Sequence, residues 1–319
     1  MLTLDTLRQA RATLGDTLEA TPLVTAHALT DSLACRVRLK AELFQRTGSF
    51  KPRGALNWVR TASQEELSKG LGAVSAGNHA LGLAWAARSV GARATIVMPA
   101  DASPFKTQGA RALGAEVILH GDINDAWTLM HQLVKERGLT LVHPYDDLRI
   151  IAGQGSVGLE ILEQAPEAAT IVCPIGGGGL ISGIGVVVDA LRPDIRLIGV
   201  EPEGAASMRE AWKQGGPHRL ERVHTCAKSL GAALVGEYTY RLCRRHVDEL
   251  VTVNEDGIAQ ALQHLLSQAK LFAEPGAAVG MAALLEGAID LPDTGDVVVV
   301  VTGGNMDRGE LDTLWRPDP

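Results

Sequence analysis

Features that mark membrane, secreted and metal-binding proteins are scarce in this sequence of 319 residues. Its four cysteines are isolated and form no CxxC pair, which is typical of reduced thiols in a cytosolic protein. None of the nine histidines belongs to an HExxH pattern, so no metal ligands are assigned. Even the aliphatic run Val297–Val301 is too short to span a bilayer, and the N-terminus lacks the apolar segment of a signal peptide. We therefore expect a cytoplasmic protein with no membrane partner.

Positive charge is also sparse. The 30 lysines and arginines are outnumbered by 37 acidic residues, which gives a formal net charge of −7. The densest basic group lies at Arg241–Arg245, with only three arginines, so a nucleic-acid partner is not expected. With 46% apolar, 21% charged and only 4% aromatic residues, the composition favours tightly packed α/β layers. The length suits two domains.

Short aliphatic runs alternate with amphipathic stretches in both halves of the chain. This alternation predicts βαβ units with parallel strands and right-handed crossovers. The runs are continuously apolar, as expected for strands that helices cover on both faces. The predicted strands are 73–74, 94–98, 116–119, 139–142, 170–173, 196–200, 249–253 and 297–301. The predicted helices include 78–89, 104–113, 124–137, 180–191, 258–269 and 277–287.

The segment Gly153–Gly158 matches the GxGxxG pattern of dinucleotide-binding proteins. That pattern requires a clean strand before it, whereas Tyr145–Arg149 is polar. It also requires an acidic residue at a strand end about twenty residues later, where Thr170–Cys173 stands instead. We favour close helix packing through small residues. An NAD-dependent oxidoreductase or a non-catalytic nucleotide-binding module stays as the rival class.

Four short motifs carry the strongest functional signal, and they fall where parallel sheets bind ligands. They are Ser49–Arg53, Ser75–His79, Gly176–Leu180 and Thr302–Asn305. The glycines of the third motif join a strand to a helix, where free N–H groups and the helix dipole favour a phosphate. Lys51 in the first motif suits covalent binding of an aldehyde, provided that burial lowers its pKa. Alone, a glycine-rich motif is equally consistent with a flexible turn, and Lys51 with a solvated surface lysine. Together, the motifs favour the binding of an aldehyde that carries a phosphate group.

In this order the motifs resemble those of the fold-type II pyridoxal-phosphate (PLP) enzymes, from Thr21–Leu23 to Asn305. The resemblance is closest to the serine/threonine dehydratase and serine racemase branch. It implies an α/β fold with two parallel-sheet domains of the tryptophan synthase beta-like architecture. Residues 1–51 and 148–319 would form a large PLP-binding domain, and residues 52–147 a small α/β domain. A homodimer is also implied.

The resemblance assigns a role to each motif. Lys51 is the catalytic residue and forms the Schiff base with PLP. The loop Ser75–His79 binds the substrate carboxylate, Asn78 contacts the 3′-oxygen of the pyridine ring, and Thr302 faces the pyridine nitrogen. The expected cofactor-binding residues are Lys51, Phe50, Asn78, Gly176, Gly177, Gly178, Gly179, Leu180 and Thr302. The expected substrate-binding residues are Ser75, Ala76, Gly77, Asn78 and His79.

Two positions favour elimination over other PLP reactions. The neutral hydroxyl of Thr302 cannot hold the pyridine nitrogen protonated, which disfavours transamination but leaves loss of a β-substituent feasible. Ala76 stands where serine racemases of this family carry a serine that moves a proton opposite the lysine, and a methyl group cannot do this. The segment Ala227–Gly231 resembles the Ala-Lys-x-Leu-Gly sequence of serine dehydratases.

The family's cation loop covers Glu201 and Ser207. Racemase-like members carry an aspartate at the position of Ser207, and its loss weakens the case for Mg²⁺ or Ca²⁺. Glu201 with backbone carbonyls suits a monovalent cation, or it is a solvated loop carboxylate. Glu274 begins a Glu-Pro pair that resembles one near the cofactor in this branch. The chain stops soon after Asn305, so no regulatory domain is expected.

These observations predict a PLP-dependent threonine/serine dehydratase, an ammonia-lyase that converts an L-β-hydroxy amino acid into a 2-oxo acid and ammonia. The partner is a small amino-acid substrate, with threonine or serine the default. The alternatives are the same chemistry on another β-hydroxy amino acid (phenylserine-type or hydroxyectoine-pathway), a serine racemase, or a β-replacement synthase.

Overall fold

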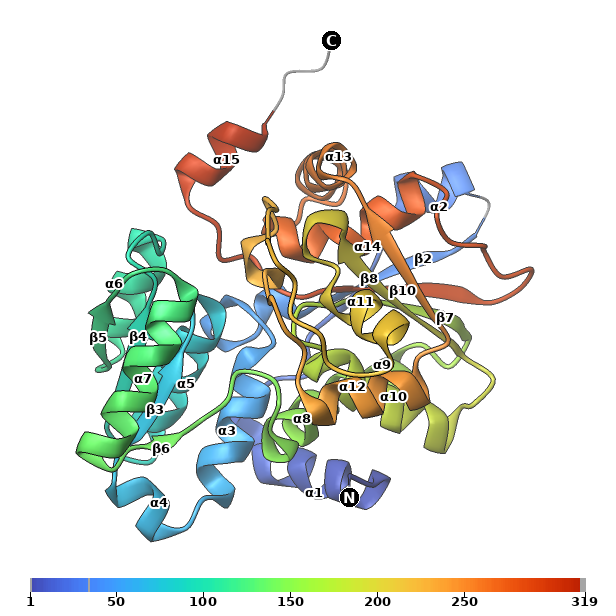
Figure 1. The fold of residues 1–319 in the computed structure, drawn as a ribbon. Helices are drawn as coiled ribbons and strands as arrows, with labels where there is room; N and C mark the ends of the chain where they lie inside the picture. The colour runs from blue at the N-terminus through green and yellow to red at the C-terminus, as the bar shows by residue number, and fades with distance from the viewer. Residues whose placement is uncertain (1, 34, 316–319) are drawn as a thin grey trace.

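Two separate β-sheets, each flanked by helices, organise residues 2–33 and 35–315, the part of the chain that the computed structural model describes (Figure 1). The large sheet has the strand order β1-β2-β10-β7-β8-β9, and the small sheet has the order β5-β4-β3-β6. Every pair of neighbouring strands is parallel except β1 and β2, which are antiparallel. The predicted α/β class with two parallel sheets is confirmed.

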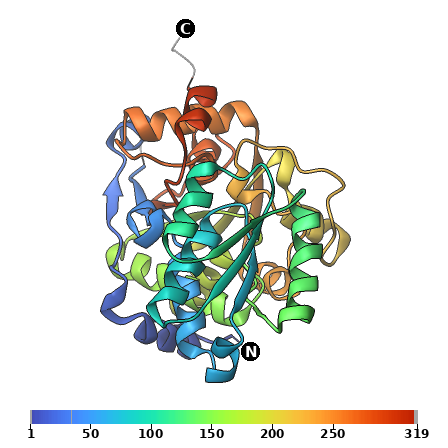
Figure 2. The same cartoon turned by 90° about the vertical axis from the view of Figure 1, so that its left-hand side faces the viewer.

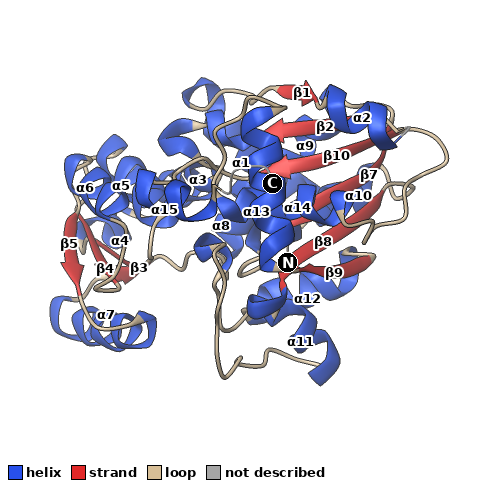
Figure 3. Ribbon diagram, turned by 90° about the horizontal axis from the view of Figure 1, so that it is seen from above, coloured by secondary structure: helices blue, strands red, loops and turns tan. Residues whose placement is uncertain are grey.

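The small sheet, which faces the viewer in Figure 2, lies between two helical layers. Helices α5 and α6 cover one face, and α7 covers the other (Figure 3). Alternate residues of a strand point to opposite faces, so Ala73 packs toward α5 while Val74 packs toward α7. The elements are β3 (Leu71–Val74), β4 (Ala94–Met98), β5 (Glu116–Leu119), β6 (Thr140–Leu141), α3 (Lys51–Thr61), α4 (Gln64–Ser68), α5 (Asn78–Ser89), α6 (Pro104–Ala112) and α7 (Ile123–Arg137).

The large sheet is also covered on both faces. On β10, Val297 and Val299 pack against α13 and α14, whereas Val298 and Val300 pack against α9 and α10. Its strands are β1 (Leu23–Thr25), β2 (Val37–Ala41), β7 (Ala168–Pro174), β8 (Arg196–Pro202), β9 (Glu249–Val253) and β10 (Asp296–Val301). Its helices are α1 (Leu4–Leu14), α2 (His27–Leu33), α8 (Leu148–Gln154), α9 (Ser156–Gln164), α10 (Gly179–Leu191), α11 (Ser207–Gln214), α12 (Glu237–His246), α13 (Glu255–Ser267), α14 (Pro275–Leu285) and α15 (Arg308–Leu314).

The two sheets draw on separate parts of the chain. All strands of the small sheet lie between residues 71 and 141, and all strands of the large sheet lie outside that span. On this basis we keep, as a proposal, a small domain of residues 52–147 and a large domain of residues 1–51 and 148–319. No helix within residues 2–33 and 35–315 is long and apolar enough to cross a membrane.

The strand β2 was not predicted from the sequence, because two cations interrupt its apolar pattern. Arg38 and Lys40 alternate with Val37 and Leu39, a pattern typical of a strand with one solvated face. In the structure Lys40 is fully buried, and its ammonium donates hydrogen bonds to the carboxylate of Glu160 (2.6 Å) and to the backbone oxygen of Thr21 (2.8 Å). Because Lys40 is buried as part of an ion pair, this interior strand does not have the continuous apolar sequence by which the other strands were predicted.

The glycines of the GxGxxG-like segment serve helix packing, as the sequence predicted. A Cβ atom on Gly153 would lie 2.4 Å from the backbone oxygen of Arg53, and one on Gly155 would lie 2.2 Å from the Cδ2 atom of Leu7. A Cβ atom on Gly158 would lie 3.2 Å from the Cα atom of Ile184. The absence of side chains therefore lets α8 approach α3, and α9 approach α10.

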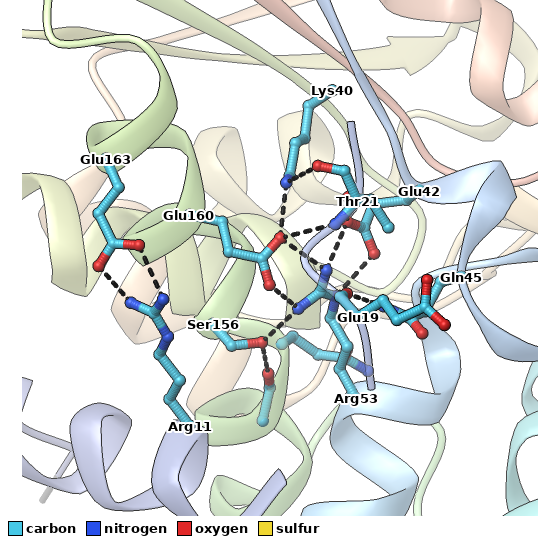
Figure 4. Close-up of polar contacts among 12 residues, drawn as sticks. Arg11, Glu19, Thr21, Lys40, Glu42, Gln45, Arg53, Ser156, Glu160 and Glu163 are labelled. Carbon is cyan, nitrogen blue, oxygen red and sulfur yellow. Dashed lines mark hydrogen bonds and ion pairs between the residues drawn. The ribbon is translucent and has the colours of Figure 1, made fainter. Parts of the chain in front are cut away.

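A buried network of charged side chains attaches α3 to the large sheet (Figure 4). The guanidinium of Arg53 donates to both oxygens of Glu42 (2.7 and 2.8 Å) and to both oxygens of Glu160 (2.5 and 2.9 Å). Lys40 supplies the second cation, so two positive charges meet two negative ones. The planar fork of arginine suits such paired carboxylates. The network lies two residues beyond Lys51 and joins the start of α3 to β2 and α9.

Replacement of Arg53 by methionine should destabilise the protein strongly. Methionine has a similar length but no charge, so it leaves buried Glu42 without its cation and Glu160 with Lys40 alone. Breaking a buried pair in this way costs about 3–5 kcal/mol, which urea denaturation measures. The control is Arg11→Met, which breaks the exposed ion pair between α1 and Glu163 of α9, the helix that also carries Glu160, and should cost no more than about 1 kcal/mol. Equal losses in the two variants would contradict the role given to the network.

Candidate active site

A cavity of about 1100 Å³ lies where the four sequence motifs meet. Loops that follow strands of both sheets line it, as expected for parallel α/β sheets. The structure brings all the predicted site residues to this one cavity: Phe50, Lys51, Ser75, Ala76, Gly77, Asn78, His79, Gly176, Gly177, Gly178, Gly179, Leu180 and Thr302. Their roles toward a cofactor or a substrate stay predictions at this point.

Lys51 is the first residue of α3, and the surrounding backbone fixes it from two sides. The N–H of Phe50 donates a hydrogen bond to the backbone oxygen of Thr302 (3.1 Å), and Ser49 forms a β-bridge with Gly303. On the other side, a Cβ atom on Gly82 would lie 3.1 Å from the carbonyl carbon of Lys51. The lysine and the loop after β10 are therefore held together by the main chain.

The ε-amine of Lys51 is in a partly apolar environment. Its Nζ atom donates a hydrogen bond to the backbone oxygen of Pro144 (3.0 Å) and lies 5.1 Å from the centre of the Phe50 ring. Desolvation lowers the pKa of Lys51 to about 8, although the carboxylate of Glu274 acts in the opposite direction. A neutral amine is thus available near physiological pH, as attack on an aldehyde requires.

The glycine loop leaves a row of backbone donors unused. Gly176–Gly179 follows β7 and leads into α10, and Gly178 has the positive φ of +88° that favours glycine. A Cβ atom on Gly177 would lie 2.2 Å from the ring of Tyr145. Within the described residues no acceptor is bonded to the N–H groups of Gly176–Gly179. A helix N-terminus with unpaired N–H groups is a binding site for a phosphate.

The loop Ser75–His79 connects β3 to α5. The hydroxyl of Ser75 accepts hydrogen bonds from the N–H groups of Gly77 (3.0 Å) and Ala80 (3.2 Å) and so shapes the start of the helix. The buried amide of Asn78 donates to Glu274 (2.5 Å) and accepts from Asn305 (2.8 Å). Asn78 is therefore fixed by residues of the large sheet's loops, although it belongs to a helix of the small sheet.

His79 lies next to Asn78 but is a poor acid or base. Its Nε2 atom is 3.3 Å from the backbone oxygen of Val142, so we assign the proton to this nitrogen. Burial, with a smaller effect of Lys51, lowers the pKa of His79 to about 3. The imidazole is thus neutral and has a structural contact rather than a proton to transfer.

Thr302 directly follows the fully buried strand β10 and is itself buried. Its backbone oxygen accepts a hydrogen bond from the N–H of Phe50, while no described residue forms a hydrogen bond with its hydroxyl group. A neutral hydroxyl that lines the cavity can donate to, or accept from, a ring nitrogen without adding charge. The unused N–H row, the lysine of lowered pKa and this hydroxyl together fit the cofactor that the motifs imply.

The cavity also contains residues that the sequence did not single out. Tyr145 packs on the glycine loop, donates a hydrogen bond from its Oη atom to the backbone oxygen of Leu234 (2.7 Å), and lies edge-on to His143 at 4.6 Å. Trp127 of α7 stacks on His143 at 5.3 Å. For Trp127 the sequence shows only a tryptophan within a predicted helix, and such a residue indicates packing rather than a functional site.

Glu201 lies outside this cavity, at the carboxyl end of β8. Its two oxygens accept hydrogen bonds from the N–H groups of Met208 (2.7 Å) and Arg209 (2.8 Å), at the start of α11. Burial raises the pKa of Glu201 to about 7, against these hydrogen bonds. No group of three or more metal-binding side chains occurs in the described ranges. Glu201 is therefore buried and not the solvated carboxylate that was one alternative.

Comparison with known proteins identifies the family of the chain. Residues 15–303 match the family model described as pyridoxal-phosphate dependent enzyme. The L-threonine ammonia-lyase of Thermotoga maritima is 41% identical over 98% of this chain and 78% of that protein. The structure of the processed form of threonine deaminase isoform 2 from Solanum lycopersicum is 36% identical, with a TM-score of 0.90, over 98% of this chain and 93% of that one. Maize serine racemase is 33% identical, with a TM-score of 0.92, over 98% and 96% of the two chains.

The lowered pKa of Lys51 predicts selective reactivity in the chain prepared without cofactor. A limiting amount of an amine-selective reagent should modify Lys51 with a half-maximal rate near pH 8, because the neutral amine is the reacting form. Ordinary exposed lysines react with a midpoint near about pH 10.4. The rate is followed by mass spectrometry of the peptide that contains Lys51. If that peptide shares the midpoint of the surface lysines, the desolvated environment described for Lys51 is wrong.

Proposed function

Because this chain belongs to the family of pyridoxal-phosphate dependent enzymes, and to its serine/threonine dehydratase branch, we propose that it dehydrates and deaminates an L-β-hydroxy amino acid. L-Threonine is the first substrate to test, with L-serine next, and the products are a 2-oxo acid and ammonia. One observation carries the proposal: a lysine of lowered pKa, a row of N–H donors without a protein acceptor among the described residues, and a neutral hydroxyl meet in one cavity.

Each of these groups has one task in the proposed reaction. Lys51 would hold the cofactor covalently, and its free amine would remove the Cα proton as a general base. The N–H groups of Gly176–Gly179 bind the phosphate, and the loop Ser75–His79 orients the substrate carboxylate at the start of α5. Asn78 would contact the 3′-oxygen carried by the pyridine ring, and Thr302 would contact the ring nitrogen. When bound, PLP supplies the electron sink for the bonds broken at Cα and Cβ.

Ala76 supports elimination rather than racemisation. Ala76 is exposed and lines the cavity, in the loop proposed to hold the substrate carboxylate. Racemisation requires a group that returns a proton to the face opposite Lys51, and a methyl group carries no such proton. Ala76 therefore favours a lyase, although maize serine racemase has a closely similar fold.

A bulkier β-substituent is the second candidate substrate class. Trp127, His143 and Tyr145 form a continuous series of ring contacts on one side of the cavity. Such rings would pack well against a phenylserine-type side chain. A panel of β-hydroxy amino acids of increasing size separates this class from threonine and serine.

We also propose a monovalent cation, a homodimer and a cytoplasmic location. The buried Glu201 supports the cation, since a single carboxylate with backbone carbonyl oxygens suits a monovalent ion. All four cysteines are free, which fits a reducing compartment. Sedimentation of the purified protein tests the dimer, and its activity in potassium against a bulky organic cation tests the cation.

The lyase reaction is tested directly with L-threonine and L-serine in the presence of PLP. We expect equal amounts of 2-oxo acid and ammonia, measured by a coupled dehydrogenase assay and an ammonia assay. Lys51→Ala should reduce kcat by at least about 10²–10⁴-fold, the contribution typical of a general base. Failure of the natural chain to turn over these substrates and every larger β-hydroxy amino acid would reject the proposed function.

Ala76→Ser should add racemisation to elimination. The new hydroxyl lies on the loop proposed to face the substrate, where it can exchange a proton with Cα. With L-serine as substrate, chiral chromatography should detect D-serine from the variant and none from the natural chain. Ala76→Gly is the control, since it changes the same position without supplying a hydroxyl. D-Serine from the glycine variant, or from the natural chain, would contradict the role given to Ala76.

A further inference from the structure

A buried ion pair crosses the cavity without a role in the reaction described so far. The Nζ atom of Lys106, on α6, lies 3.4 Å from the Oε2 atom of Glu274, the residue that directly precedes α14. The two side chains are 7% and 3% exposed. Buried ion pairs contribute little net stability, because desolvation of both charges offsets their attraction. A pair that lines the cavity therefore calls for a reason other than stability.

Glu274 holds the parts of the cavity together. Its Oε1 atom accepts a hydrogen bond from the amide of Asn78 (2.5 Å), and its backbone N–H donates to Gly303 (3.0 Å), the residue after Thr302. The carboxylate thereby fixes Asn78 relative to the loop after β10. The same negative charge works against the neutral amine of Lys51, because it favours the protonated form.

Lys106 is placed to offset that charge. Its stem lies on the loop proposed to bind the substrate carboxylate: a Cβ atom on Gly77 would be 2.6 Å from the Cδ atom of Lys106 and 3.4 Å from its Nζ atom. The ammonium group is thus next to both Glu274 and the substrate loop. Because residue 77 is a glycine without a Cβ atom, the side chain of Lys106 has space to lie against this loop.

We propose that Lys106 is a positioning residue that acts through Glu274: its ammonium group balances the Glu274 carboxylate, so that Glu274 can hold Asn78 without keeping the Lys51 amine protonated. The inference rests on the proposed role of Lys51 and adds an electrostatic partner to it. The pair joins α6, on the small sheet, to the start of α14, on the large sheet, so the balance exists only when both sheets' loops are in place.

The other titratable groups that face Lys51 do not supply this balance. Burial lowers the pKa of His79 to about 3 and that of His143 to about 4, so both rings are neutral at pH 7. Burial likewise raises the pKa of Tyr145 to about 12. Asp307, at the start of α15, is a second carboxylate in electrostatic contact with Lys106. It adds to the negative charge that the lysine offsets.

Two substitutions with opposite signs test the proposal. Lys106→Met leaves Glu274 uncompensated, so protonation of the Lys51 nitrogen should move to higher pH by about one unit, as expected for one nearby charge. Glu274→Gln keeps a hydrogen-bond acceptor for Asn78 but removes the charge, so the midpoint should move to lower pH. The double variant should return close to the natural midpoint. The readouts are the pH titration of the visible absorbance of the cofactor-loaded protein and the labelling midpoint of Lys51 in the cofactor-free chain.

Matched controls separate electrostatics from damage to the fold. Lys106→Arg keeps the charge and should leave the midpoint nearly unchanged. Lys69→Met removes an exposed lysine from its surface pair with Glu65 and should change nothing. Circular dichroism and thermal unfolding establish that each variant is folded; if Lys106→Met is not, Lys106→Gln takes its place.

Shifts of the two single variants in the same direction, or no shift in folded variants, would overturn the proposal. This outcome is distinct from failure of the proposed function. A natural chain that binds the cofactor and titrates as described, yet leaves every β-hydroxy amino acid unchanged, would reject the lyase assignment alone.

Discussion

The placement of one lysine is the constraint on which the rest of the structure depends. Lys51 begins α3, and three kinds of contact fix that helix start: main-chain bonds to the loop after β10, close packing against Gly82, and the charged network around Arg53. Each comes from a different part of the chain. The amine can face the cavity at a defined point only because the backbone that carries it has so little freedom.

Charge inside the cavity follows from the same arrangement. A desolvated amine is a good nucleophile, but desolvation also makes it sensitive to every nearby charge. Glu274 is such a charge, and it is needed where it is because it bonds to Asn78. The opposing lysine on α6 resolves this conflict at the point where the loops of the two sheets meet. The carboxylate that positions Asn78 is therefore also a charge that influences the protonation of Lys51.

The sequence predicts the parts of this protein whose signals are local, and misses those that require the fold. Apolar runs such as Val297–Val301 and the glycines at 176–179 carry their structural meaning in a few consecutive residues. Lys40 and Lys106 carry theirs only in three dimensions, since each looks like a surface lysine until its distant carboxylate, Glu160 or Glu274, is known. The short segment Gly153–Gly158 shows the reverse case, in which a familiar pattern serves helix packing.

The most direct test of the account is chemical identification of the residue that holds the cofactor. The protein is incubated with PLP, reduced with borohydride and digested, and the peptides are sequenced by mass spectrometry. The account predicts one phosphopyridoxyl group per chain, on the peptide that contains Lys51, with loss of the visible absorbance on reduction. A label on another lysine, or no label at all, would contradict it.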